Sequence, residues 1–518
     1  MKFLRFLFGR FFIITLLVIV QAAAFVLAIV YLDRVTPYYY YINAGFSALG
    51  VLIVLVLVNR RINPNYIVPW IVIVLIFPVV GVVVYLMFSQ NRLSRSQKKR
   101  YRKIFDSVTD YVPQSQSVAD KLNKTDRDMY GQSRYLLSAN KLPVYDDTQC
   151  RYYPTGEEFF AALKDELKKA RKYIFMEYFV IKKGVMWDSV LKILMQKVNE
   201  GVEVRFMYDD IGSISTVSSN YCKKLRKLGI KCVKFNKFLP VISAVHNNRD
   251  HRKMTVIDGK VGFMGGANLS DEYINVGISK KCGYWKDSAI KLTGGAARSM
   301  AVMFLQMYNA QTKSREDFAP YLSEVSNVGT GGESGHGFIQ PFGDGPMPLY
   351  LEKVSQTAIL NMINQAENYV YITTPYLIVD FQLMDAIKRA AKRGVDATII
   401  TPHIPDKRII FLMTRSSYRP LIQAGVKIYE YLPGFIHSKN FLADDKAAIV
   451  GTINMDYRSL VHHFECGVWM HGVPCISDIK KDFAAILSVS RRVSDEESRL
   501  NPFQKAFRVV LELFAPLL

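Results

Sequence analysis

Cysteine and acidic residues are both scarce in this chain. Six cysteines are scattered over 518 residues, and none of them forms a C-x-x-C pair. This spacing argues against a structural zinc site and against a dense disulfide framework, and it fits a reducing compartment. There are 45 acidic residues against 67 Lys and Arg, which leaves a formal charge of +22. Such a surplus predicts an anionic partner, either nucleic acid or an acidic membrane surface.

Charged residues are also nearly absent from long stretches of the first ninety positions. Three apolar runs cover about residues 11–32, 42–58 and 67–88. The first and third are long enough to cross a bilayer of about 30 Å, and no A-x-A-like cleavage site suggests a removable signal peptide. The second run is shorter and contains Asn43, so we expect either two or three spans. The chain is therefore expected to be a multi-pass protein of the cell membrane.

The basic residues that flank these runs predict the orientation of the anchor. If all three runs cross, one side carries five basic residues and the other carries eight, seven of them between Arg92 and Lys103. The positive-inside rule favours the second side as cytoplasmic, which places the main domain there. Two spans allow the same placement. The basic stretch after residue 88 is expected either to lie against anionic headgroups or to form a solvated helix face.

The remainder of the chain contains one α/β unit twice. Thr155 and Glu158 form a capping-box pattern that starts a helix, and alternating strand and helix patterns follow as far as residue 233. The same order recurs 196 residues later, where Tyr369-Val-Tyr-Ile corresponds to Tyr173-Ile-Phe-Met. This alternation predicts a parallel sheet covered by helices. The expected fold class is α/β, with two similar α/β/α units packed around a shared active site behind N-terminal transmembrane helices.

Composition changes along the chain suggest six segments. They are a transmembrane anchor (1–90), a basic juxtamembrane segment (91–150), a first repeat (151–310), a linker rich in Gly, Ser and Asn (311–345), a second repeat (346–500) and an amphipathic C-terminal tail (501–518). The tail is expected either to lie on the membrane or to dock on the main domain.

Each repeat ends in the motif H-x-K-x4-D-x6-G-x-x-N. Its polar residues are His251, Lys253, Asp258 and Asn268 in the first copy, and His437, Lys439, Asp444 and Asn454 in the second. His and Lys two positions apart on a strand point to the same face. The imidazole can then act as nucleophile or acid, while the ammonium and the Asn amide hold an anionic oxygen. The Asp lies near a turn, where it is better suited to fixing the backbone or the Lys.

Two such motifs facing each other would surround one phosphorus atom. The lysines meet the charge of the phosphate, so no metal and no cofactor is expected. Carboxylates are not clustered with the histidines at metal-ligand spacing in the sequence. His462, His463 and His471 resemble a metal cluster at first, but we interpret them as loop or packing histidines because they lack a carboxylate at helical spacing.

The double motif resembles the phospholipase D superfamily. The stretch 70–85 with Pro78 and Gly81, Gly283-Tyr-Trp-Lys-Asp287 and the closing Ala515-Pro-Leu-Leu518 are similar to bacterial cardiolipin synthases, so the resemblance covers nearly the whole chain. It implies that one His forms a phosphohistidine while the other acts as general acid and then as base. It also implies transfer of a phosphatidyl group between two phosphatidylglycerol molecules, with cardiolipin and glycerol as products. Phosphatidylglycerol and anionic membrane lipids are then the expected partners, without nucleic acid.

By analogy, His251 attacks phosphorus and His437 serves as acid and base, although this order could be reversed. The resemblance assigns the phosphoryl oxygens to Lys253, Lys439, Asn268 and Asn454, and the motif aspartates are counted with the catalytic set. It also implies a histidine-orienting carboxylate at Glu465, 28 residues after His437. Asp287 is the candidate for the same task opposite His251, and both acids could instead be ordinary surface carboxylates.

Other functions remain open at this point. A hydrolase would use water as acceptor, and a phosphatidylserine synthase would use serine. A nuclease of the same superfamily would explain the charge of +22, but the membrane spans argue against it. A basic membrane protein with an inactive site is disfavoured because both motifs are intact. The oligomeric state is not legible.

Overall fold

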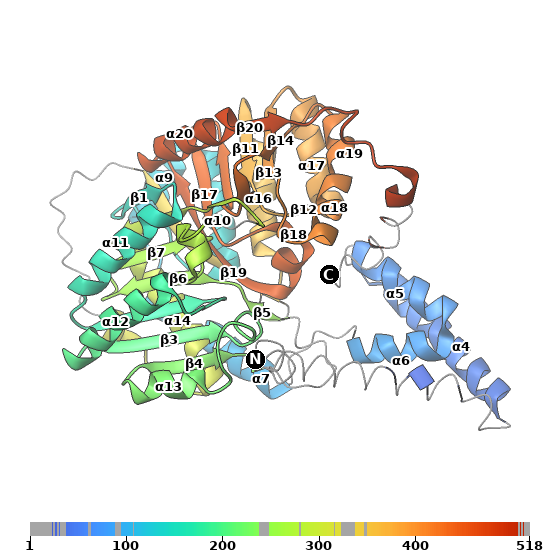
Figure 1. Ribbon diagram of the computed structural model, residues 1–518, viewed down its shortest axis with the longest axis horizontal. Coiled ribbons are helices and arrows are strands. Elements are labelled where there is room, and N and C mark those ends of the chain that lie inside the picture. Colours follow the sequence, from blue (N-terminus) through green and yellow to red (C-terminus); the bar gives the residue numbers. More distant parts are fainter. Residues whose placement is uncertain are drawn as a thin grey trace.

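The computed structural model describes residues 23, 26–27, 31, 38–60, 64–88, 95–106, 108–237, 248–278, 281–314, 316–322, 337–346, 350–505, 508 and 511. Figure 1 shows the anchor helices as a projection beside a larger body that contains both repeats. Of the expected span 11–32, all but a few residues lie outside the described residues.

The anchor contains α4 (Tyr39–Val58), α5 (Pro64–Ile76) and α6 (Pro78–Phe88). Within the described residues, α4 alone is long and apolar enough to cross a membrane, with a mean hydropathy of 2.3 over a window of 18 residues. The prediction of a single span over 67–88 is wrong, because the chain breaks before Pro78, which lacks a backbone N–H donor. At 1.5 Å per residue, α5 and α6 are only about 20 and 16 Å long.

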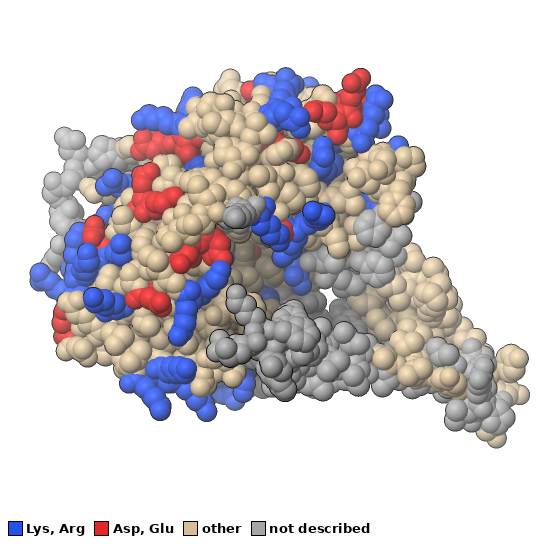
Figure 2. All heavy atoms as spheres, in the orientation of Figure 1, with Lys and Arg blue, Asp and Glu red and all other residues tan. Residues whose placement is uncertain are grey.

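The two short helices fold back on each other as a hairpin. The rings of Trp70 and Tyr85 lie 5.6 Å apart, although a straight helix would separate them widely. Gly81 permits this return, because a Cβ at that position would collide with the backbone of Ile73. Figure 2 shows uncharged side chains over these helices on the visible face.

The segment between the anchor and the first sheet belongs to the body rather than to a separate juxtamembrane unit. It forms α7 (Arg95–Asp106), α8 (Val108–Tyr111), α9 (Gln116–Thr125) and α10 (Arg127–Asn140). Tyr101 of α7 is buried, and its hydroxyl accepts a hydrogen bond from Nε2 of Gln311 at 2.7 Å. Gln132 of α10 donates to the carbonyl of Ala358 in the second repeat. The basic helix is thus attached to the catalytic body.

The first repeat is built on a seven-stranded sheet in the order β1-β9-β7-β6-β2-β3-β4. Its strands are β1 (Gln149–Tyr153), β2 (Tyr173–Tyr178), β3 (Glu203–Asp209), β4 (Lys231–Phe235), β6 (Lys253–Ile257), β7 (Val261–Gly265) and β9 (Ala289–Thr293). Only β2, β3 and β4 are parallel. The prediction of a parallel sheet therefore holds for the βαβ portion, whereas the strands that follow each motif return by short turns and pair antiparallel.

The second sheet repeats this order as β10-β19-β17-β16-β11-β13-β14 and adds β20 (Ser490–Arg492). Its strands are β10 (Phe338–Asp344), β11 (Tyr369–Thr373), β13 (Asp396–Pro402), β14 (Lys427–Tyr431), β16 (Asn440–Ala443), β17 (Ala447–Gly451) and β19 (His463–His471). The expected linker 311–345 is too long, because β10 already belongs to this sheet and occupies the position of β1. The edge strands β1 and β10 lie outside the sequence pattern that is repeated in the two halves. For this reason the pattern did not mark β10 as a strand, and the linker was predicted too long.

Helices cover both sheets. They are α11 (Gly156–Lys169), α12 (Val185–Asn199), α13 (Tyr221–Lys227) and α14 (Ala296–Thr312) in the first repeat, α15 (Ala319–Leu322) between the repeats, and α16 (Val354–Gln365), α17 (Phe381–Lys392), α18 (Arg408–Ser416), α19 (Tyr418–Ile422) and α20 (Cys475–Ser488) in the second. The expected capping box is confirmed, since the Thr155 hydroxyl accepts from the backbone N–H of Glu158 at 3.2 Å.

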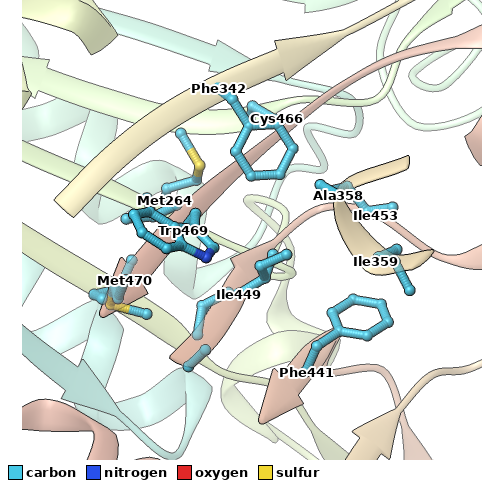
Figure 3. Close-up of a cluster of buried hydrophobic side chains, with 14 of the residues drawn as sticks. Met264, Phe342, Ala358, Ile359, Phe441, Ile449, Ile453, Cys466, Trp469 and Met470 are labelled. Atoms are coloured by element: carbon cyan, nitrogen blue, oxygen red, sulfur yellow. The ribbon is translucent and has the colours of Figure 1, made fainter. Parts of the chain in front are cut away.

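One hydrophobic core joins the two repeats. Met264 of β7 packs in the same cluster as Phe342, Trp469 and Met470 of the second sheet, as Figure 3 shows. A disulfide also links Cys150 on β1 to Cys475 at the start of α20, while the other four cysteines are free and buried. The chain has no dense disulfide framework among these residues, but this bond disagrees with the reducing compartment indicated by the scattered cysteines.

Candidate active site

Each motif histidine is anchored on the opposite repeat. The backbone N–H of His251 donates to the carbonyl of Phe464 at 2.9 Å, and that of His437 donates to the carbonyl of Lys286 at 2.7 Å. The strands just before the two histidines continue this exchange. β5 (Arg249–Asp250) pairs with the start of β19, and β15 (Gly434–Ile436) pairs with β8 (Tyr284–Lys286). The active site is therefore assembled only where both repeats meet.

The orienting carboxylates cross between the repeats in the same way. Nδ1 of His251 lies 2.9 and 3.1 Å from the two oxygens of Glu465, and Nδ1 of His437 lies 2.6 Å from Oδ2 of Asp287. The assignment of Asp287 to His251 is thus wrong, because strand pairing brings it to His437. The reading of both acids as surface carboxylates is also wrong, since both are fully buried. An accepting carboxylate places the proton on Nδ1 and leaves Nε2 unprotonated.

Neighbouring groups hold these carboxylates in place. The hydroxyls of Thr452 and Ser459 donate to Glu465, and the backbone N–H of Ser288 donates to Asp287 at 2.8 Å. Gly266 corresponds to Thr452 in the first repeat, and a Cβ there would collide with the Asp287 carboxylate. The sequence indicates this difference between the two carboxylate sites through Gly265-Gly266 in one motif tail and Gly451-Thr452 in the other. The sequence interpretation did not use it.

The two lysines lie beside the histidines, and both are buried. Nζ of Lys253 donates to the carbonyl of His251 at 2.5 Å, and Nζ of Lys439 donates to the carbonyl of His437. Burial lowers the pKa of Lys253 to about 8 and that of Lys439 to about 7. The positive charge of each ammonium group is only partly neutralised by its surroundings. The lysines are therefore suited to bind an incoming phosphodiester anion.

Electrostatics show that the two motifs converge. Burial lowers the pKa of both histidines well below the usual value, and the charges of both lysines lower it further at each imidazole. The charge of His437 also lowers the pKa of His251. The site therefore holds two neutral imidazoles, and Nε2 of each is the nitrogen that can attack phosphorus or exchange a proton.

The two motif asparagines have different surroundings. Asn268 accepts from the backbone N–H of Val180 at 2.9 Å and donates to the Tyr273 hydroxyl at 2.7 Å. By contrast, the buried Oδ1 of Asn454 has no hydrogen-bond partner in the described part of the chain. The structure brings both residues to the site region, but Asn268 also supports the loop that follows β2.

The motif aspartates do not belong to the catalytic set. The Asp258 carboxylate accepts the backbone N–H groups of residues 171–173 at 2.8–2.9 Å, and Asp444 does the same for residues 367–369. Both lie at the ends of β6 and β16 away from the histidines, and both have a positive φ, 52° and 54°. Their role is to fix the turn and the entry into β2 and β11, as the turn position suggested.

His463 lies in the site, contrary to its interpretation as a packing histidine. Its ring centroid lies 5.3 Å from that of His251, and Trp285 stands in the equivalent place 5.6 Å from His437. Nitrogen and oxygen atoms of His251, His463 and Glu465 all lie within 4.8 Å of one another, a set that could ligate a metal ion. The ammonium groups of Lys253 and Lys439 oppose a cation at this position. His471, the last residue of β19, instead forms a hydrogen bond with the carbonyl of Lys446.

Two H-x-K motifs that converge from duplicated α/β halves define a site of the phospholipase D type. In agreement, residues 163–276 and 359–487 match the family described as cardiolipin synthase, PLD-like domain, and residues 48–90 match the phospholipase D-nuclease N-terminal family. A cardiolipin synthase of Halalkalibacterium halodurans is 33% identical over 474 residues, which cover 90% of this chain and 91% of that protein. The chain therefore belongs to the cardiolipin synthase family.

Two further proteins are similar to this chain. An uncharacterized protein of Streptococcus mutans is 43% identical over 471 residues, which cover 90% of this chain and 99% of that one. The crystal structure of a phosphatidylserine synthase of Haemophilus influenzae superposes with a TM-score of 0.54 at 15% identity, covering 74% of this chain and 97% of that chain. At this identity the likeness concerns the fold alone.

Proposed function

We propose that this chain is a membrane-bound cardiolipin synthase that transfers a phosphatidyl group from one phosphatidylglycerol to another and releases glycerol. The observation that carries the proposal is the pair of neutral imidazoles, each held by a carboxylate of the opposite repeat and flanked by both lysines. This arrangement supplies one nucleophile, one acid or base and two cations for a single phosphodiester. A covalent intermediate then divides the transfer into two steps.

In the first step, Nε2 of His251 attacks phosphorus of the donor lipid. The bond between phosphorus and the headgroup oxygen breaks, and that oxygen keeps the electron pair and takes a proton from Nε2 of His437. Lys253, Lys439 and the two asparagines hold the non-bridging oxygens. Binding of the anionic lipid offsets the ammonium charges and raises the proton affinity of His437, so that Nε2 of His437 takes up a proton from solvent before it acts as the acid.

In the second step, His437 acts as base. It takes the proton from a headgroup hydroxyl of the acceptor lipid, whose oxygen attacks phosphorus. The phosphorus–nitrogen bond breaks and its electron pair returns to His251. Water or serine as acceptor would give a hydrolase or a phosphatidylserine synthase with the same residues, and the uncharged anchor argues against a nuclease.

Mass spectrometry of lipids after incubation of the full chain with phosphatidylglycerol vesicles tests the proposal. Cardiolipin and glycerol are expected as products. Phosphatidic acid alone would show a hydrolase, a product that appears only with added serine would show a serine transferase, and unchanged lipid would contradict catalysis.

The order of the histidines has its own test. A phosphatidyl ester with a nitrophenol leaving group needs no acid, so His437→Ala is expected to accumulate a phosphoenzyme, whereas His251→Ala is not. The reverse pattern would exchange the two roles. Each substitution is expected to lower turnover with phosphatidylglycerol by roughly 10²–10⁴-fold.

We further propose that α4 crosses the membrane, with the catalytic body on the cytoplasmic side. The hairpin of α5 and α6 is too short for two further crossings of about 30 Å, so we propose that it enters the bilayer without spanning it. The exposed Lys99, Arg102 and Lys103 of α7 would then face anionic headgroups while Tyr101 faces the body.

A further inference from the structure

The second repeat carries a feature that the first repeat lacks beside the active site. Between β13 and β14 it inserts α18 ahead of α19, whereas the described first repeat has turns and the short α13 between β3 and β4. β13 ends at Pro402, but the matching strand β3 ends in buried Asp209 followed by buried Asp210. The two halves of the duplicated domain therefore differ at this point. The proposed reaction also treats its two lipids differently, because chemically identical molecules take different roles in it.

The inserted helix forms one side of a cavity of about 60 Å³ that opens to solvent. Ile378, Ile410 and Met413 give it an apolar wall, and Lys407 and Arg458 add two cations. Leu511 of the C-terminal segment already packs in the cluster that contains Met413, which shows that this wall accepts an aliphatic group. The expected docking of the tail on the main domain is confirmed for this residue.

The cavity is one aromatic ring away from His437: the ring of Tyr376 in its lining lies 6.3 Å from that of Phe435, and the Phe435 ring lies 5.8 Å from that of His437. The lining of the cavity also includes Asp456, which follows Asn454 by two residues, and the charge of Asp456 raises the pKa of Lys439. The charge of Lys407 is among those that lower the pKa of His437. In the view of Figure 1, α18 and β18 (Met455–Asp456) lie on the side of the body toward α5, where an alkyl chain would leave for the bilayer.

The two cations of the cavity are available to an anion. Within the described chain, no carboxylate lies at ion-pair distance from the Lys407 ammonium. Arg458 faces Asp456 but also Arg249, and burial lowers its pKa. A ligand with one phosphodiester charge and an aliphatic body fits a cavity with two cations and an apolar wall.

We infer that this cavity binds the acceptor phosphatidylglycerol. Lys407 and Arg458 hold its phosphodiester, the wall formed by Ile378, Ile410 and Met413 contacts its glycerol backbone and first acyl carbons, and its headgroup hydroxyl faces His437. The inference rests on the proposed function, because it assigns the second lipid of that reaction. It explains why only the repeat that carries the base has α18.

Two reactions of the same protein separate this site from the catalytic one. Exchange of radiolabelled glycerol into phosphatidylglycerol needs one lipid and a small alcohol, whereas cardiolipin formation needs a second lipid. For the double variant Lys407→Gln/Arg458→Gln, kcat/KM for cardiolipin formation is expected to fall by roughly 10- to 100-fold, the usual range for lost charge-assisted hydrogen bonds. Glycerol exchange by the double variant is expected to fall by far less, about 3-fold at most. The single variant Lys407→Arg, which keeps the charge, is expected to retain most cardiolipin formation.

Lys388→Gln/Lys392→Gln on α17 is the matched control for loss of two charges. Equal losses in both reactions would overturn the inference, because the cavity would then serve the donor lipid or the fold. Unchanged cardiolipin formation would overturn it as well. A wild-type protein with neither activity would instead contradict the proposed function, and a wild type that exchanges glycerol without forming cardiolipin would show that no acceptor lipid binds.

Discussion

At the scale of single residues, the crossed carboxylates make a sharp prediction. Because Asp287 holds His437 and Glu465 holds His251, each acid should reproduce the loss of the histidine it contacts. With the nitrophenol ester, Asp287→Asn is expected to accumulate phosphoenzyme, whereas Glu465→Gln is expected to form little of it. Turnover with phosphatidylglycerol should fall by roughly 10²–10⁴-fold in both variants.

Asp385→Asn on α17, a half-buried carboxylate that pairs with Arg389, serves as control for this comparison. If each carboxylate served its own repeat, the two phosphoenzyme results would be exchanged. Equal behaviour of both variants would show that the acids support folding only.

The buried lysines that serve the proposed reaction lower the stability of the folded chain. The folded-state pKa of Lys439 is about 7, far below the 10.5 of a free lysine, so the unfolded chain binds more protons between these values. Stability contributed at this site therefore rises with pH from about 7 to about 10, and the charged lysine costs a few kcal/mol below pH 7. Lys439→Met is expected to raise Tm at pH 7 in phosphate-free detergent solution, with little gain at pH 10, while activity is lost.

Lys388→Met on α17 controls for a simple gain in hydrophobicity. A Lys439→Met variant that is less stable than the wild type at pH 7, or equally shifted at both pH values, would refute the assignment of a strained ammonium.

At the scale of elements, the anchor hairpin depends on one glycine. A methyl group at Gly81 would meet the backbone of Ile73, whereas Gly45 in α4 has nothing within 4 Å of an added Cβ. Gly81→Ala is expected to destabilise the anchor by about 1–3 kcal/mol, as overpacking does. Activity on vesicles should then fall more than activity on a short-chain soluble substrate.

Gly45→Ala is the matched control, and it should be neutral or slightly stabilising because alanine favours a helix. Equal effects of the two substitutions would mean that α5 and α6 do not form a tight hairpin.

Helix α7 connects the anchor to the body through Tyr101 and presents cations on its other side. Each basic residue near an anionic surface contributes about 1 kcal/mol. Reversal of Lys99, Arg102 and Lys103 to Glu should therefore lower kcat/KM on phosphatidylglycerol vesicles roughly 100-fold at low salt, and the difference should shrink at high salt.

Reversal of Lys388, Arg389 and Lys392 on α17 changes the charge equally on the opposite side of the body in Figure 1. A similar loss in this control, or a loss that salt does not reduce, would refute contact between α7 and the headgroups.

The sequence predicted the elements that depend on local patterns and missed those that depend on contact between repeats. The helices after Thr155 and the strands at Tyr173 and Tyr369 follow from capping and apolar periodicity. The partner of Asp287 depends on the pairing of β8 with β15, which lies far away in sequence. For the same reason, no local pattern marked His463 or the edge strand β10 as part of the site and of the sheet.

At the scale of the whole molecule, two observations disagree about the compartment. The basic residues after residue 88 predict a body in the cytoplasm, where glutathione keeps thiols reduced, yet Cys150 and Cys475 form a disulfide. Their Cα atoms lie 6.3 Å apart, within the range in which a bond closes without backbone movement. The pair can therefore exist as two thiols in the cell and close on oxidation.

We predict that both cysteines are reduced in living cells. Acid quenching of cells that contain the full chain, followed by alkylation and peptide mass spectrometry, should find Cys150 and Cys475 alkylated to the same extent as the buried free thiol Cys466. Protection of only these two until a reductant is added would place the body in an oxidising compartment and refute the cytoplasmic orientation. Cys150→Ser should leave vesicle activity unchanged within about twofold, because the shared core already joins the two repeats without this bond.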